Sequence, residues 1–140
     1  MLGEWEGRGG LQYFLIIKMR GGHSLRSLHT RAFMDFRVRQ AIRLISADLR
    51  RPLVLEEIAR TVNLSPPRLR YLFKAETGMT PAQHLKSLRM QKAKGLLEES
   101  FLNVKQIMLQ VGINDESHFA RDFRELYGLT PAEYRKSVRE

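Results

Sequence analysis

The last third of this 140-residue chain repeats the part before it. When residues 55–89 are laid over residues 104–139, apolar positions, two glycines and two Thr-Pro pairs coincide. The matched pairs are Ile58/Ile107, Val62/Val111 and Leu64/Ile113 at an offset of 49 residues, and Leu69/Phe119, Phe73/Phe123, Gly78/Gly128, Thr80/Thr130, Pro81/Pro131 and Arg89/Arg139 at an offset of 50. The offset changes from 49 to 50 within a turn, and the spacing of the apolar residues is the same in both copies on either side of that turn. Two copies of a helix-turn-helix unit would tolerate such a slip.

Each copy is predicted to hold a short helix, a tight turn and a longer helix. In the first copy the turn lies at 63–65, where Ser65 caps the longer helix and Pro66 takes its first position. Proline is harmless there, because the first helical N–H has no partner within the helix. In the second copy the turn lies at 112–114, and Asp115 is the predicted cap.

The end of each longer helix is also marked. Gly78 and Gly128 suit a left-handed C-terminal cap. The segments 80–83 (Thr-Pro-Ala-Gln) and 130–133 (Thr-Pro-Ala-Glu) follow them and have the spacing of a capping box, which begins another helix.

Two further helices complete an all-α prediction. Apolar residues recur at spacings of three and four from Val38 to Leu49, which indicates one amphipathic helix that Arg51-Pro52 interrupts. A second helix, over 81–98, connects the two copies and would be about 27 Å long. Successive major grooves on one face of B-DNA lie about 34 Å apart, so this connector suits two helices that read neighbouring grooves.

The charge of the chain favours a polyanionic partner. Lys and Arg number 24 against 15 acidic residues, which gives a net charge of +9. Nucleic acid is the first candidate and an anionic membrane surface the second. Charge alone does not decide between them.

Several function classes are disfavoured. The chain has no Cys, and its four histidines are scattered, so we predict no disulfide, no thiolate zinc site and no other metal site. No catalytic set or phosphate-binding glycine loop has useful spacing, so we predict no enzyme. The longest apolar run, 13–17, is far shorter than the roughly 20 residues that span a bilayer. With acidic Glu4 and Glu6 at the start and no cleavage site, a cytoplasmic location is expected.

Longer stretches in both copies carry a family resemblance. In the first copy they are Leu55-Glu56-Glu57-Ile58-Ala59, Leu64-Ser65-Pro66 with Leu69 and Leu72-Phe73-Lys74, and Glu76-Thr77-Gly78-Met79-Thr80-Pro81. In the second they are Val111-Gly112-Ile113, Ser117-His118-Phe119-Ala120-Arg121-Asp122-Phe123, and Gly128-Leu129-Thr130-Pro131-Ala132-Glu133-Tyr134-Arg135. On these residues the chain resembles the DNA-binding domain of the AraC/XylS family of transcription regulators, over about 38–139.

The resemblance implies seven helices, two of which, at about 65–76 and 115–126, read the major groove of double-stranded DNA. The residues implied to face bases are Pro67, Arg70, Tyr71, Glu116, Ser117 and Arg121. The residues implied to contact phosphates are Ser65, Arg68, Lys74, Arg124 and Arg135. Such a regulator is expected to bind promoter or operator DNA near the nucleoid, to contact RNA polymerase and to need no cofactor.

Three residues depart from the arrangement that direct readout favours. Tyr71 stands where the family often has Arg, Pro67 offers no donor, and Glu116 would meet phosphate repulsion. Recognition through DNA shape, or dominance of the second copy, is the alternative to direct readout by both helices.

The expected domain organisation has two parts. Residues 1–37 are a leader or the remnant of an interdomain linker, and the apolar stretch 11–19 within them fits a strand or a helix equally well. Residues 38–140 form the DNA-binding domain, divided into a first subdomain (38–79), a linker helix (80–98) and a second subdomain (99–140). The chain is either a compact regulator or a fragment that lacks an effector-binding domain. A helical protein-protein interaction module is the competing function.

Overall fold

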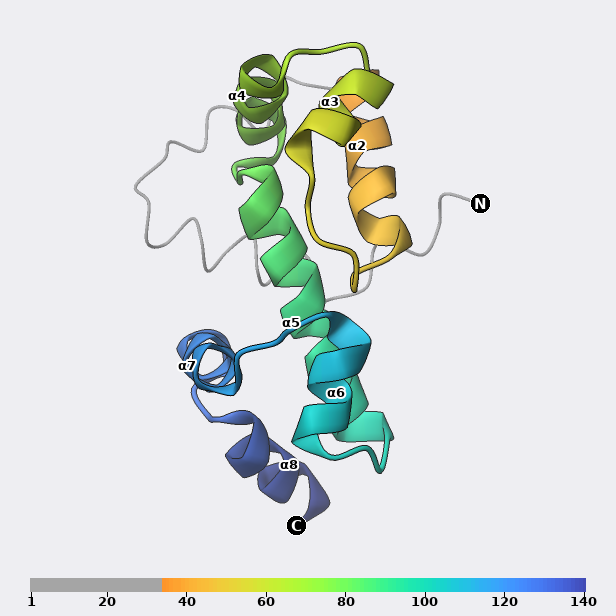
Figure 1. The fold of residues 1–140 in the computed structure, drawn as a ribbon. Coiled ribbons are helices and arrows are strands. Elements are labelled where there is room, and N and C mark those ends of the chain that lie inside the picture. Colours follow the sequence, from red (N-terminus) through yellow and green to blue (C-terminus); the bar gives the residue numbers. More distant parts are fainter. Residues whose placement is uncertain (1–33) are drawn as a thin grey trace.

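The computed structural model describes residues 34–140, which form seven helices and no strand (Figure 1). The helices are α2 (Phe36–Ala47), α3 (Leu55–Thr61), α4 (Pro66–Thr77), α5 (Pro81–Glu99), α6 (Val104–Val111), α7 (Glu116–Tyr127) and α8 (Pro131–Arg139). The predicted all-α class is therefore confirmed for this part of the chain. The predictions for residues 1–33, including the stretch 11–19, lie outside the described residues. Among the helices of 34–140, none is both long enough and apolar enough to cross a membrane.

Two hydrophobic cores divide the helices between them. The first core contains Val38, Ala41, Ile45, Ala59, Val62, Leu69, Phe73 and Leu85. The second contains Met90, Ala93, Leu97, Ile107, Met108, Val111, Phe119 and Phe123. Helix α5 contributes to both, because Leu85 lies in the first core and Met90 in the second. The fold is thus two helix-turn-helix subdomains joined by one shared helix, as predicted.

The two helix-turn-helix turns close in the same way. The amide of Leu64 donates to the carbonyl five residues earlier at 2.9 Å, and the amide of Ile113 makes the same bond at 2.9 Å. The residue before each amide has a left-handed backbone, with φ of 57° at Asn63 and 80° at Gly112. Asn and Gly are the residues that adopt this conformation most readily. The repeat in the sequence is therefore a repeat of backbone geometry.

The starts of the two longer helices match the predicted caps. The Ser65 hydroxyl accepts a hydrogen bond from the Arg68 amide at 3.3 Å. The Asp115 carboxylate accepts one from the His118 amide at 2.9 Å. Each cap satisfies one of the free N–H groups at a helix start, a contribution of about 1 kcal/mol. The caps therefore fix where α4 and α7 begin.

Capping boxes begin three helices, one more than the sequence analysis found. The boxes at Thr80 with Gln83 and at Thr130 with Glu133 start α5 and α8, as predicted. A third box, at Asn103 with the glutamine three residues later, starts α6. Its spacing is the same, so the signal was present in the sequence.

Helix α2 differs from its predicted range of 38–49. It begins at Phe36, because the Asp35 carboxylate caps it by accepting from the amide two residues on, at 2.8 Å. It ends at Ala47, because Asp48 is extended and its carboxylate accepts from the amide two residues later, at 3.0 Å. The apolar period continues past this point, but the side-chain bond of Asp48 competes with the helix.

An aromatic pair recurs in the two cores at the same offset of 50 residues. Phe73 meets the ring of His84 edge-on at 5.4 Å, and Phe123 meets Tyr134 edge-on at 5.5 Å. Burial lowers the pKa of His84. Burial, followed by the hydrogen bond that the Tyr134 hydroxyl donates to Glu98, raises the pKa of that tyrosine to about 12. The second core therefore holds a phenol where the first holds a titratable imidazole.

Candidate nucleic-acid interface

Helix α4 buries one face in the first core and exposes the other. Leu69 and Phe73 are completely buried. The residues predicted to meet DNA in this half are all exposed, namely Ser65, Pro67, Arg68, Arg70, Tyr71 and Lys74. The Arg68 guanidinium lies 5.5 Å from the centre of the Tyr71 ring, a cation-π distance. The exposed face of α4 therefore offers cations and one aromatic ring that is 65% exposed.

Helix α7 is built on the same plan. Phe119 and Phe123, which match the buried pair of α4, fill the second core. The predicted DNA-facing side chains Glu116, Ser117, Arg121 and Arg124 are exposed. The Asp115 carboxylate, besides capping α7, lies 2.7 Å from Nδ1 of His118. That exposed imidazole is therefore paired with the cap of α7.

A charged network that the sequence analysis missed connects α7 with α5. Asp122 places one carboxylate oxygen 2.9 Å from Nζ of Lys86 and the other 3.5 Å from Nε of Arg121. The Asp122 side chain is only 13% exposed, whereas that of Arg121 is 65% exposed. Asp122 thus lies near the Nε atom of Arg121, while most of the Arg121 side chain stays exposed. Spacing alone gave no signal for it, because Lys86 and Asp122 are far apart in the sequence.

The two longer helices lie toward the same side in Figure 1. Both α4 and α7 are on the left of the view, whereas α3 lies to the right of α4 and α6 is drawn across the lower half of α5. Each of the two helices exposes the face that is turned away from its own buried pair, Leu69 and Phe73 in α4 and Phe119 and Phe123 in α7. The predicted length of the connector, 81–98, is confirmed within one residue.

Comparison with protein families identifies this architecture. The model of a family described as a helix-turn-helix domain matches residues 58–137. The chain belongs to the AraC-type helix-turn-helix family. The match runs through both turns and all of α5, so it covers the connected pair of units and not one unit alone.

Relatives and solved structures of this family agree with the assignment. An uncharacterized HTH-type transcriptional regulator of Haemophilus influenzae is 34% identical over 107 residues, which are 76% of this chain and 36% of that protein. A probable AraC family transcriptional regulator of Rhodopseudomonas palustris superposes with a TM-score of 0.69 at 29% identity, covering 76% of this chain and 100% of that one. The DNA-binding domain of AdpA, solved in complex with a target DNA, gives 0.69 at 25% identity, covering 75% and 95%. The chain spans about a third of the curated relatives that it matches first.

The two outward helices of this AraC-type domain differ in charge. Helix α4 carries three basic residues and one acidic residue, whereas α7 carries two basic and three acidic residues. Of the acidic residues in α7, Asp122 is paired with cations and Glu116 lies in the first turn, where the helix dipole favours a negative charge. Charge therefore favours phosphate contacts at α4 more than at α7.

Arg135 lies apart from the other predicted phosphate contacts. Its guanidinium donates to the carbonyl of Leu102 and lies 3.4 Å from the carbonyls of Leu96 and Ser100. The side chain is half-buried and spans the loop between α5 and α6. A phosphate contact would have to displace these bonds, so we assign Arg135 to the support of that loop.

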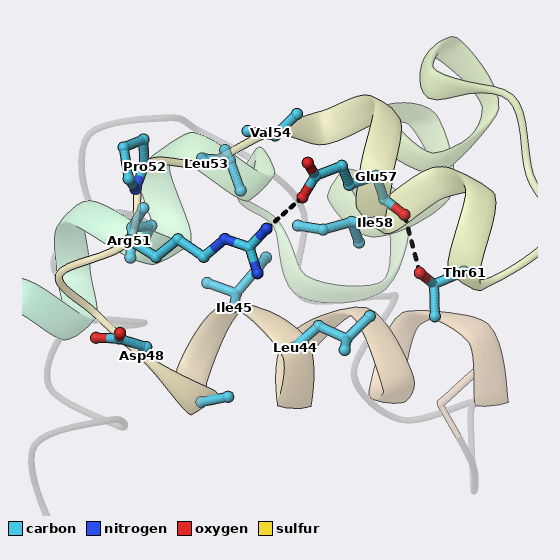
Figure 2. Close-up of a pocket in the computed structure, with 12 residues that line it drawn as sticks. Leu44, Ile45, Asp48, Arg51, Pro52, Leu53, Val54, Glu57, Ile58 and Thr61 are labelled. Atoms are coloured by element: carbon cyan, nitrogen blue, oxygen red, sulfur yellow. Dashed lines mark hydrogen bonds and ion pairs between the residues drawn. The ribbon is translucent and has the colours of Figure 1, made fainter.

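A shallow pocket lies between α2, α3 and the loop that joins them, in the first subdomain (Figure 2). Its lining is mostly apolar, and Leu44 and Val54 are partly exposed at it. Arg51 reaches Glu57 across it at 2.7 Å. None of the residues predicted to contact DNA lines this pocket.

Proposed function

We propose that this chain binds double-stranded DNA at a preferred sequence and thereby regulates transcription, with α4 and α7 entering neighbouring major grooves. The observation that carries the proposal is the pair of equivalent helices, each with one face in a core and the other exposed. The proposal takes both exposed faces to meet DNA from the same side of the molecule. The net charge of +9 and the likeness to a domain solved with its target DNA support it.

Base recognition is assigned to six exposed residues of α4 and α7. Arg70 and Arg121 can each donate two hydrogen bonds to guanine, and Tyr71 can contact a thymine methyl group. Glu116 can accept from the amino group of cytosine, and Ser117 can donate or accept. Pro67 contributes shape only, because it lacks a donor.

Phosphate contacts are assigned to other exposed residues of α4 and α7 and to the cap of α4. The residues are Ser65, Arg68, Lys74 and Arg124, without Arg135. Phosphate contacts position a protein on the duplex without reading its sequence. Because α4 has the more positive face, we assign more of the sequence-independent affinity to the first subdomain.

The proposal includes the division of the described chain into 38–79, 80–98 and 99–140, with the second segment as the spacer between half-sites. RNA polymerase is the proposed protein partner, and the cytoplasm, at the nucleoid, is the proposed location. The relatives are longer than this chain, and of their activities we propose only DNA binding and transcription regulation for it.

The proposal is tested by selecting bound sequences from a random DNA pool and measuring affinity for the selected site against salt. Each cationic phosphate contact contributes about 0.9 to the slope of log affinity against log salt, so the three assigned cations predict a slope of roughly −3 or steeper. Affinity without sequence preference, or binding that salt does not weaken, would contradict the proposal.

The apolar pocket of Figure 2 favours a second candidate, a protein-interaction module. In that case binding to a protein would withstand salt and would be lost on Leu44→Asp, whereas DNA selection would yield no preferred sequence. The same salt titration separates the two functions.

A further inference from the structure

The two subdomains touch through their backbones at Gly112. A Cβ added to this glycine would lie 2.6 Å from the carbonyl oxygen of Leu49 and 2.7 Å from Cα of Arg50. Gly112 belongs to the turn of the second subdomain, whereas Leu49 and Arg50 follow α2 in the first. Side chains do not come so close to backbone atoms, so only glycine fits this contact.

Glycine is required here by the contact and not by the turn alone. Asn63 holds the equivalent position in the first turn with φ of 57°, so that turn accepts a side chain. Gly78 and Gly128 have φ close to that of Gly112, yet a Cβ at either would meet no atom within 4 Å. The close approach is therefore a property of the junction between subdomains.

The loop that Gly112 touches is also held by α5. Nε of Arg89 donates to the carbonyl of Leu49 at 2.8 Å, and its terminal nitrogen donates to the carbonyl of Arg51 at 3.2 Å. The Arg51 side chain in turn pairs with Glu57 of α3 (Figure 2). Gly112 therefore rests on a segment that is fixed to the first subdomain.

A second contact fixes α7 itself. Lys86 follows Leu85, which belongs to the first core, and its ammonium group lies 2.9 Å from the nearly buried Asp122 of α7. This ion pair links the second outward helix to the part of α5 that belongs to the first subdomain. Together with the contact at Gly112, this ion pair attaches the second subdomain to the first at two separate places.

We infer that Gly112 and Lys86 are positioning residues that fix the rotation of α7 relative to α4, and so restrict the protein to one spacing between its two DNA half-sites. The inference rests on the proposed function. Helix α5 sets the distance between the subdomains, whereas the contacts at Gly112 and Lys86 oppose a change in how the second subdomain packs around α5. One extra base pair shifts the second half-site by about 3.4 Å and rotates it by about 35°. A fixed joint would be unable to follow that change.

The joint, meaning the contact of Gly112 with residues 49–50 and the ion pair of Lys86 with Asp122, is tested first without DNA. The chain has no Cys, so spin labels at Glu56→Cys on α3 and Lys105→Cys on α6, exposed positions 49 residues apart, report the distance between the subdomains. We expect one narrow distance distribution in the parent. Gly112→Asn and Lys86→Gln should broaden or shift it, whereas the controls Gly128→Asn and Lys92→Gln should not. Unchanged distributions in folded Gly112→Asn and Lys86→Gln would overturn the joint.

The consequence for DNA is tested with the selected site and with sites whose half-sites are one base pair closer or farther apart. We expect the parent and both controls to lose at least tenfold in affinity on the altered sites, and the joint variants to lose less than threefold. Equal spacing discrimination in all variants would overturn the positioning role. A chain that binds no DNA would refute the proposed function, and the spin-label distances would still decide whether the joint exists.

Discussion

Arg89 and Arg139, 50 residues apart, hold equivalent loops. The guanidinium of Arg89 donates to the carbonyls of Leu49 and Arg51 in the loop before α3, and that of Arg139 donates to the carbonyl of Ser100, in the loop before α6, at 3.0 Å. In each half, the helix that closes the subdomain thus fixes the segment that leads into the helix-turn-helix.

The bonds of Arg89 predict a stability effect. Arg89→Met should lower the free energy of unfolding by about 2 kcal/mol, because two carbonyls lose a charged donor while the aliphatic packing is kept. Urea denaturation followed by circular dichroism measures this loss. Arg60→Met, on the exposed side of α3, should change stability by less than about 0.5 kcal/mol. Equal effects at the two sites would show that the bonds of Arg89 add nothing.

Arg121 is predicted to discriminate between sequences. Arg121→Ala should cost about 1–3 kcal/mol at the selected site and little on random DNA, because a base contact is lost only where its base is present. Arg124→Ala should weaken both to a similar extent, as expected for a phosphate contact. Competition binding measured by fluorescence anisotropy gives the affinity for the selected site and the affinity for random DNA. If Arg121→Ala lowered the two affinities equally, the residue would be a phosphate contact.

Phe123 is predicted to hold the second core together. Its ring is completely buried and contacts Phe119, Tyr127 and Tyr134. Phe123→Ala should reduce the free energy of unfolding by about 3–5 kcal/mol through the cavity that it leaves. Phe101, which is 94% exposed, provides the matched control. An unchanged melting temperature in Phe123→Ala would refute the packing described here.

His84 is predicted to make the first subdomain sensitive to acid. Burial lowers its pKa in the folded state, so the folded chain resists protonation more than the unfolded chain, whose histidines titrate near 6.5. The contribution of neutral His84 to the free energy of unfolding is therefore complete above pH 6.5. It is lost as the pH falls from 6.5 through the lowered pKa of the folded state. Unfolding measured from pH 7.5 to 5 should show this decline.

A variant without the imidazole assigns the decline to His84. His84→Phe keeps a ring against Phe73 and should flatten the decline. An identical pH profile in the parent and in His84→Phe would contradict the assignment.

The helices were predictable because their signals are local. Caps such as Ser65 and Asp115 act on amides within three residues, and the repeat supplied each signal twice. The end of α2 was placed two residues too late because the apolar period continues to Leu49, whereas the carboxylate of Asp48 redirects the backbone. Periodicity shows which residues face the core, but it does not show where a side-chain hydrogen bond ends a helix.

The parts of the site that sequence did not predict depend on contacts between distant segments. Lys86 meets Asp122, and Gly112 meets Leu49, only after the two subdomains have packed on α5. The family resemblance implies a phosphate contact for Arg135, yet its long side chain reaches back to the loop before α6. The contacts of a long side chain depend on how distant segments pack, and a sequence pattern does not show this packing.

Footprinting of the selected duplex tests the central claim most directly. Methylation protection of guanine N7 reports major-groove occupancy base by base. Two equivalent helices that meet DNA from the same side of the molecule predict two protected patches about one helical turn apart, with Arg70→Ala removing protection in one patch and Arg121→Ala in the other. A single patch, or the same patch affected by both variants, would contradict simultaneous reading by α4 and α7.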